Sequence, residues 1–150
     1  ITLSLPIDEP KEIPELNTFS EALNAKVLEA YKGIDDFMVV LEDEAAIANN
    51  NPDFNLIKAM DSRGLIITAK GEEVDFVSRW YGPQTGINED PATGSAHALL
   101  TTYWSKILNK PQMSARQLSK RVGHLKCEVK DDLVEITGKA KLYLKGNIQV

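Results

Sequence analysis

One stretch constrains the fold of this chain more than any other, because no formally charged residue occurs between Asp90 and Lys106. Apolar residues in and after it recur at helical spacing: Ala96, Leu99, Leu100, Tyr103, Ile107 and Leu108. The opposite side of such a helix is small, neutral or aromatic: Ala98, Thr101, Thr102, Trp104 and Ser105. A helix without a charged face is usually buried on most sides. We therefore expect a central helix, ending at Leu108, wrapped by β-strands.

The motif EDPATGSAH at residues 89–97 leads directly into this helix. The proline after Asp90 favours an extended backbone at Asp90. Thr93 is a candidate N-cap residue, and Gly94 lets the backbone approach another group closely. The first turn of a helix has unpaired N–H groups and a partial positive charge, so it can bind an anion. We predict a site for a carboxylate or phosphate beside Asp90 and Ser95.

A structural interpretation of the same residues stays open. Asp90 can order its own turn, and Ser95 can simply occupy the first helical turn. His97 lies in that turn too, where the helix dipole disfavours imidazolium, so we expect a neutral, hydrogen-bonding histidine. A lone histidine on a buried helix is more often structural than catalytic.

Composition excludes several classes of function. The 150 residues suffice for one sizeable core. A net charge of −5 argues against a nucleic-acid partner. The single cysteine, Cys127, excludes an internal disulfide and favours a reducing compartment. The sequence lacks a hydrophobic run of the roughly 20 residues that span a bilayer, so we expect no membrane partner. We expect no metal, because His124 and Cys127 would point to opposite faces of a strand.

The rest of the sequence is mainly strand-like. Strands are expected at residues 1–6, 36–41, 65–69, 74–81, 115–119, 125–129, 133–137 and 140–144. Short helices are expected from Thr18 or Ser20 to Leu23, at 26–31, at 44–48 and after an Asp53 cap. Residues 1–17 are expected to be a connecting strand and an exposed linker. Because the chain opens in a strand at Ile1, we expect it to be part of a longer protein.

Several of these motifs together resemble the phenazine-biosynthesis isomerase (PhzF-like) family. The residues that support the resemblance are DFVSRW (75–80), Pro83, Gly86-Ile87, EDPATGSAH (89–97), Tyr103-Trp104, QLS (117–119), Gly123 and the region 138–146. The resemblance covers roughly residues 31–148 and concerns the second half of the family's chain. Trp80-Tyr81-Gly82 departs from the family's more usual Phe-containing, Ala-Pro strand ending.

The resemblance implies an α+β fold similar to one half of diaminopimelate epimerase, a curved mixed β-sheet around one central helix. Residues 1–150 would then be a single domain, the C-terminal half of a two-domain protein whose site lies in the cleft between the domains. The implied activity is a cofactor-independent isomerisation by proton transfer on a small carboxylate, as on the dihydro-hydroxyanthranilate of the phenazine enzyme. A cytoplasmic homodimer is the implied assembly.

The resemblance also assigns roles to individual residues. Asp90 and Ser95 would be catalytic, and Thr93, Gly94, Ser95 and His97 would bind the substrate. The principal acid/base would be a glutamate of the missing N-terminal domain, so we expect the 150 residues alone to be inactive. The alternative is a non-catalytic module of the same fold that binds a small anion or a partner.

Overall fold

The structure is a computed structural model that describes residues 1–147. Within these residues ten strands form one mixed sheet in the order β1-β10-β9-β8-β6-β5-β4-β3-β2, with β7 paired to β6. The strands are β1 (Thr2–Pro6), β2 (Lys11–Glu12), β3 (Glu29–Lys32), β4 (Asp36–Val40), β5 (Gly64–Lys70), β6 (Phe76–Gly82), β7 (Ile87–Glu89), β8 (Gln112–Gln117), β9 (Gly123–Lys130) and β10 (Leu133–Gly138). The pairs β4–β5 and β6–β8 are parallel, and the other pairs are antiparallel.

Four α-helices and one 3-10 turn complete the described chain: α1 (Asn17–Leu23), α2 (Glu44–Ala48), α3 (Phe54–Lys58), η1 (Pro83–Thr85) and α4 (Gly94–Leu108). The predicted cap of α3 is confirmed, because the Asp53 carboxylate accepts a hydrogen bond from the backbone N–H of Asn55 at 2.8 Å. Asn109 ends α4 in the left-handed conformation that asparagine tolerates (φ 52°).

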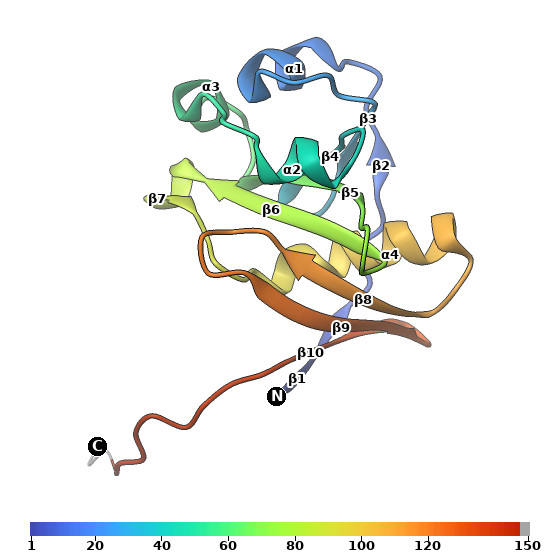
Figure 1. Ribbon diagram of the computed structural model, residues 1–150, viewed down its shortest axis with the longest axis vertical. Helices are drawn as coiled ribbons and strands as arrows, with labels where there is room; N and C mark the ends of the chain where they lie inside the picture. Colours follow the sequence, from blue (N-terminus) through green and yellow to red (C-terminus); the bar gives the residue numbers. More distant parts are fainter. Residues whose placement is uncertain (148–150) are drawn as a thin grey trace.

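The sheet curves around α4. This helix contacts β1, β9 and β10 toward one end of the sheet and also β4 near the other, which a flat sheet would not allow. The shorter helices α2 and α3 pack on the opposite face of β5 and β6, with α1 beside α3 (Figure 1). The predicted fold class, a curved mixed sheet around one central helix, is confirmed.

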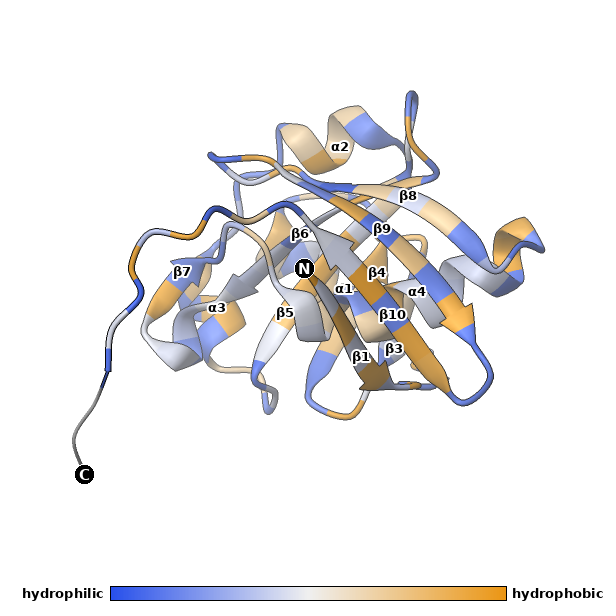
Figure 2. Cartoon of the chain, turned by 90° about the horizontal axis from the view of Figure 1, so that it is seen from below, coloured by the Kyte–Doolittle hydropathy of each residue, from blue (hydrophilic) through white to orange (hydrophobic). Residues whose placement is uncertain are grey.

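Each face of the sheet has its own apolar core. The inner core joins α4 to residues such as Ile66, Phe76 and Met113, and the outer core lies under α1, α2 and α3. All nine residues from Ala96 to Trp104 are buried, so the uncharged helix is enclosed as its sequence predicts. Alternation sets the faces: along β9 apolar and polar residues follow one another (Figure 2), and Cys127 points inward while His124 is exposed.

Several predicted elements differ from the structure. Residues 26–31 are not a helix: the segment Glu29–Lys32 is strand β3, because pairing with β4 outweighs its weak helical pattern. The expected linker 7–17 contains the short strand β2. Ile107, predicted on the buried stripe of the central helix, is 57% exposed in the last turn of α4.

Two further differences concern strand pairing. Strand β7 was not predicted, since three residues are too few to show alternation. The segment 140–144 forms no strand, because no strand of the described chain lies beside it to complete a ladder. Figure 1 shows this segment leaving the body of the molecule.

Candidate functional site at the start of the central helix

The N-terminus of α4 is open. Thr93 is the N-cap residue in an extended conformation (φ −105°, ψ 100°), but no side chain of the described residues caps the helix. The Thr93 hydroxyl instead donates to the Asp90 carboxylate, with 2.6 Å between Oγ1 and Oδ2. Ser95 is exposed and Gly94 half-buried. Because first-turn N–H groups point beyond the helix end, the amides of Gly94 and Ser95 and the Ser95 hydroxyl form a potential anion site.

Gln117, at the end of β8, holds the loop that precedes this anion site. Its buried side-chain amide accepts a hydrogen bond from the Thr93 N–H at 2.8 Å and donates to the Asp90 carbonyl at 2.7 Å. The same nitrogen lies 3.2 Å from the Thr93 hydroxyl oxygen. A second contact, from the Ser119 hydroxyl to the Pro91 carbonyl at 2.9 Å, fixes the middle of the loop. The QLS motif therefore positions the EDPATGSAH motif.

Asp90 lies in this loop, half-buried, within the same hydrogen-bonded group as Thr93. Its backbone N–H donates to the Trp80 carbonyl at 3.2 Å, and Thr93 occupies one carboxylate oxygen. These two hydrogen bonds agree with the structural interpretation, in which Asp90 orders its own turn. The geometry also leaves a carboxylate beside the anion site, so the catalytic role of Asp90 stays a prediction.

An ion pair that the sequence did not predict lies next to Ser95. Arg63, just before β5, binds both oxygens of Asp36 through Nε and Nη2, with 3.1 Å between Nε and Oδ1. Its remaining terminal nitrogen, Nη1, donates to the Ser95 hydroxyl oxygen at 2.9 Å. Asp36 is 3% exposed at the start of β4. Hydrogen bonding to Asp36 raises the pKa of Arg63, so the guanidinium stays charged.

Trp80 completes this arrangement. Its indole Nε1 donates to Asp36 Oδ2 at 3.1 Å. The ring fits where two glycines leave room: a Cβ on Gly64 would lie 2.5 Å from the ring, and one on Gly82 closer still. Glycine at both positions therefore allows the tryptophan to reach the buried carboxylate.

His97 lies entirely inside the core. Its Nδ1 is 2.8 Å from the Thr93 carbonyl oxygen, and its ring centroid is 6.1 Å from that of Phe76. Burial lowers the pKa of His97 to about 4, against a smaller opposing effect of the Thr93 hydrogen bond. The expected neutral, hydrogen-bonding histidine agrees with this placement. No surface of His97 is exposed to a ligand in this chain, and its predicted binding role stays a prediction.

The structure brings Asp90, Thr93, Gly94, Ser95 and His97 together because they are near in sequence. The partners that arrange them, Arg63, Asp36 and Gln117, come from other elements. Asp36 offered a weak signal: a charged residue that opens an apolar strand requires a partner if it is buried.

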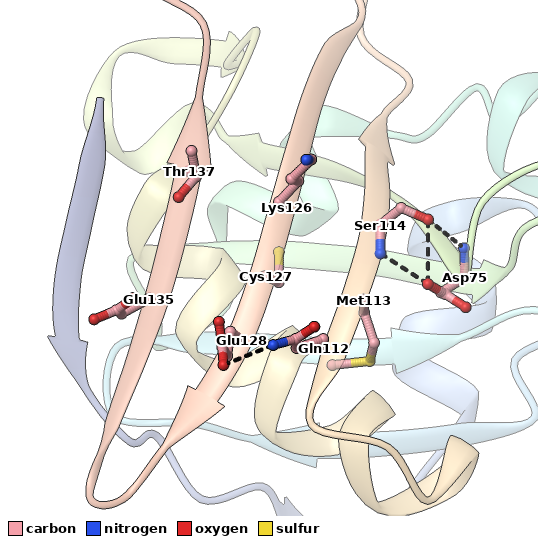
Figure 3. A pocket seen from close by; sticks show the side chains of 9 residues that line it. All are labelled: Asp75, Gln112, Met113, Ser114, Lys126, Cys127, Glu128, Glu135 and Thr137. Carbon is pink, nitrogen blue, oxygen red and sulfur yellow. Dashed lines mark hydrogen bonds between the residues drawn. The ribbon is translucent and has the colours of Figure 1, made fainter.

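A surface hollow lies away from the start of α4, and the described residues contain neither a metal-binding cluster nor a membrane-spanning helix. A hollow of about 380 Å³ over β8, β9 and β10 is lined by Asp75, Lys126, Glu128 and others and contains none of the predicted site residues (Figure 3). In residues 1–147 no three histidine, cysteine or acidic side chains are placed to hold a metal ion. Nor does any helix in this range have the length and apolar character needed to cross a membrane.

Comparison with known proteins identifies the family. Residues 5–146 match the family described as phenazine biosynthesis-like protein. The chain belongs to this family.

The phenazine biosynthesis-like relatives are longer than this chain. An uncharacterized isomerase of Pseudomonas aeruginosa is 41% identical over all 150 residues, which cover 58% of its own length. A PhzF-family crystal structure from Enterococcus faecalis is 48% identical with a TM-score of 0.91, over 99% of this chain and 57% of that one. A putative PhzC/PhzF protein from Clostridium difficile is 36% identical with a TM-score of 0.87, over the same shares. The chain therefore spans somewhat more than half the length of these relatives.

Proposed function

We propose that this chain is the C-terminal half of a PhzF-like isomerase that acts by proton transfer on a small carboxylate-bearing metabolite. The observation that supports this most directly is the uncapped N-terminus of α4. Thr93, the residue that would ordinarily cap the helix, turns its hydroxyl to Asp90 instead. The first amides of α4 are thereby left for an external anion.

In this proposal the amides of Gly94 and Ser95 bind the substrate carboxylate, and the Ser95 hydroxyl adds a third donor. Asp90 lies beside them, and its Oδ2 accepts a hydrogen bond from Thr93. Its Oδ1 accepts a proton from the substrate carbon or returns one to it. His97 contributes through its bond to the Thr93 carbonyl, which holds the N-cap residue in place.

We propose that the second acid/base group lies in a part of the complete protein outside these 150 residues, corresponding to the part of the relatives that this chain does not cover. Proton transfer at carbon requires an acid/base group within reach of the proton that moves, and Asp90 is the only acidic side chain that the proposal places beside the anion site. We propose a glutamate of an N-terminal domain, in a cytoplasmic homodimer that uses no cofactor. The 150 residues alone should then show no deuterium incorporation into a dihydro-hydroxyanthranilate in D₂O.

Gly94→Val tests the anion site in the complete protein. A Cβ at Gly94 would meet only the Leu3 side chain, at 3.4 Å, so the fold should tolerate the change. The valine side chain would cover the amides. Calorimetric titration with benzoate should show binding by the parent and none by Gly94→Val. Ser95→Ala should weaken binding by about 0.5–1.5 kcal/mol, or up to about 3 if the hydroxyl meets the charge.

Gly138→Val is the matched control, because a Cβ there has no neighbour within 4 Å. It should bind benzoate like the parent. Equal binding by Gly94→Val and the parent would contradict the anion site and leave the loop with a structural role. If the complete protein binds benzoate but does not isomerise the dihydro-hydroxyanthranilate, the non-catalytic module is favoured. In that case the hydrogen bond from Thr93 to Asp90 Oδ2 serves only to order the loop.

A further inference from the structure

Ser95 does not stand alone at the start of α4, because a fixed cation reaches its hydroxyl. Arg63 uses Nε and Nη2 on Asp36 and Nη1 on Ser95, so each of its three nitrogens has a defined acceptor. A guanidinium is planar, and holding two of its nitrogens on one carboxylate fixes the direction of the third. The position of Ser95 Oγ relative to Arg63 is therefore set by Asp36.

Asp36 is fixed in turn from the core. Trp80 donates to its Oδ2, and Gly64 and Gly82 leave the slot that the indole ring occupies. The Asp36 backbone carbonyl accepts from Gly33, which anchors the start of β4. Residues from three separate segments, Gly33–Asp36, Arg63–Gly64 and Trp80–Gly82, thus hold the guanidinium that reaches the serine hydroxyl.

The charge of Arg63 is largely compensated. Asp36 is its bidentate partner and is buried, so the pair contributes little net charge at the anion site. The specific effect of Arg63 is then on Ser95. A hydroxyl has two acceptor lone pairs and one proton. When its oxygen accepts from a cation, the hydroxyl is polarised, and its proton is left to be donated to another acceptor.

We infer that Arg63 is a positioning residue that makes the Ser95 hydroxyl a committed hydrogen-bond donor to an anion bound at the start of α4. This inference rests on the proposed function, since it requires a carboxylate at that place. It adds a role for Arg63, Asp36 and Trp80 that the EDPATGSAH motif does not contain. Arg63 acts through Ser95 and need not touch the substrate.

A double-mutant cycle in the complete protein tests whether Arg63 acts through Ser95. Benzoate is titrated into the parent, Arg63→Met, Ser95→Ala and the double variant. Arg63→Met should weaken binding about tenfold, or about 1.4 kcal/mol, when Ser95 is present. In the Ser95→Ala background the same change should weaken binding less than about twofold. An equal factor in both backgrounds, or no effect of Arg63→Met, would overturn the inference.

Arg63→Met leaves a buried carboxylate without its cation, which can destabilise the fold. The cycle is therefore repeated with the paired change Asp36→Asn/Arg63→Met in place of Arg63→Met. The asparagine side chain keeps an oxygen for the Trp80 N–H, and neither member of the buried ion pair remains. The paired change should again weaken benzoate binding only when Ser95 is present, with melting temperatures within a few degrees of one another. Parent-like affinity of Asp36→Asn/Arg63→Met would overturn the inference.

The outcome also separates this inference from the proposed function. A parent that does not bind benzoate would contradict the anion site itself, and with it both proposals. A parent that binds benzoate, loses binding with Gly94→Val and is unaffected by Arg63→Met would retain the proposed function and exclude a role for Arg63.

Discussion

His97 makes the stability of this chain depend on pH. Burial lowers its pKa to about 4 in the folded protein, compared with about 6.5 for an unfolded histidine. Between these values the unfolded chain binds a proton that the folded chain excludes, so stability falls as pH falls. Lowering the pH from 7.5 to 4 should remove up to about 3 kcal/mol of unfolding free energy, measured by urea denaturation.

His97→Asn is the control for this prediction. An asparagine amide can still donate to the Thr93 carbonyl but does not titrate. Burial raises the pKa of Asp8, which acts in the opposite direction near the lower end of this range, and both proteins share that group. The difference between parent and variant isolates His97. Equal slopes of stability against pH would contradict the buried, neutral histidine.

Gly64 should not tolerate even a methyl group. A Cβ there would lie 2.5 Å from the Trp80 ring, which is packed on all sides. Gly64→Ala should lower the unfolding free energy by about 1–3 kcal/mol through overpacking. Gly138→Ala adds the same methyl group to open space on β10. It should change the unfolding free energy by less than about 0.5 kcal/mol. Thermal melts of both variants test this, and equal melting temperatures would show that Trp80 can move aside.

At the residue scale the sequence predicts the site only where the site is local. Asp90, Thr93 and Ser95 are neighbours in one loop and one helical turn, so their proximity follows from the chain itself. Arg63 and Asp36 meet Ser95 through the sheet, which places residues far apart in sequence together. No periodicity in a single segment contains that information.

At the element scale, α4 provides a direct test of the buried helix. Leu100 is fully buried against the inner face of the sheet, whereas Ile107 is 57% exposed in the last turn. Leu100→Ala should cost about 2–5 kcal/mol of unfolding free energy. Ile107→Ala should change it by less than about 1 kcal/mol, because little apolar surface is uncovered. Similar losses for both in urea denaturation would contradict the placement of the helix in the curve of the sheet.

Long or strongly alternating elements could be predicted from the sequence, and weak ones could not. Strands β4, β5, β9 and β10 and the central helix appear near their predicted bounds. Strand β3 lacks a distinct pattern and exists because β4 pairs with it. The segment 140–144 has the pattern of a strand without a neighbour to pair with. Pattern reports which face is apolar, whereas pairing decides whether a strand forms.

At the scale of the whole molecule, two layers of different character cover the sheet. The outer core is closed by three short helices, and the inner core is closed by a single long one that enters the sheet's curve. Beyond β10, Leu142, Tyr143 and Leu144 are 85%, 98% and 78% exposed. These side chains bury little surface here, so the stability of the described fold does not depend on them.

The pairing of β1 with β10 also determines when this fold can be completed. Thr2 is in register with Thr137, and the Gly138 N–H donates to the Ile1 carbonyl, 137 positions away. During synthesis β1 leaves the ribosome before β10 and must wait, unpaired with β10, until that strand has been made. Closing so long a loop is slow compared with forming a helix. During that interval β1 is a free strand available to chaperones or to neighbouring nascent chains.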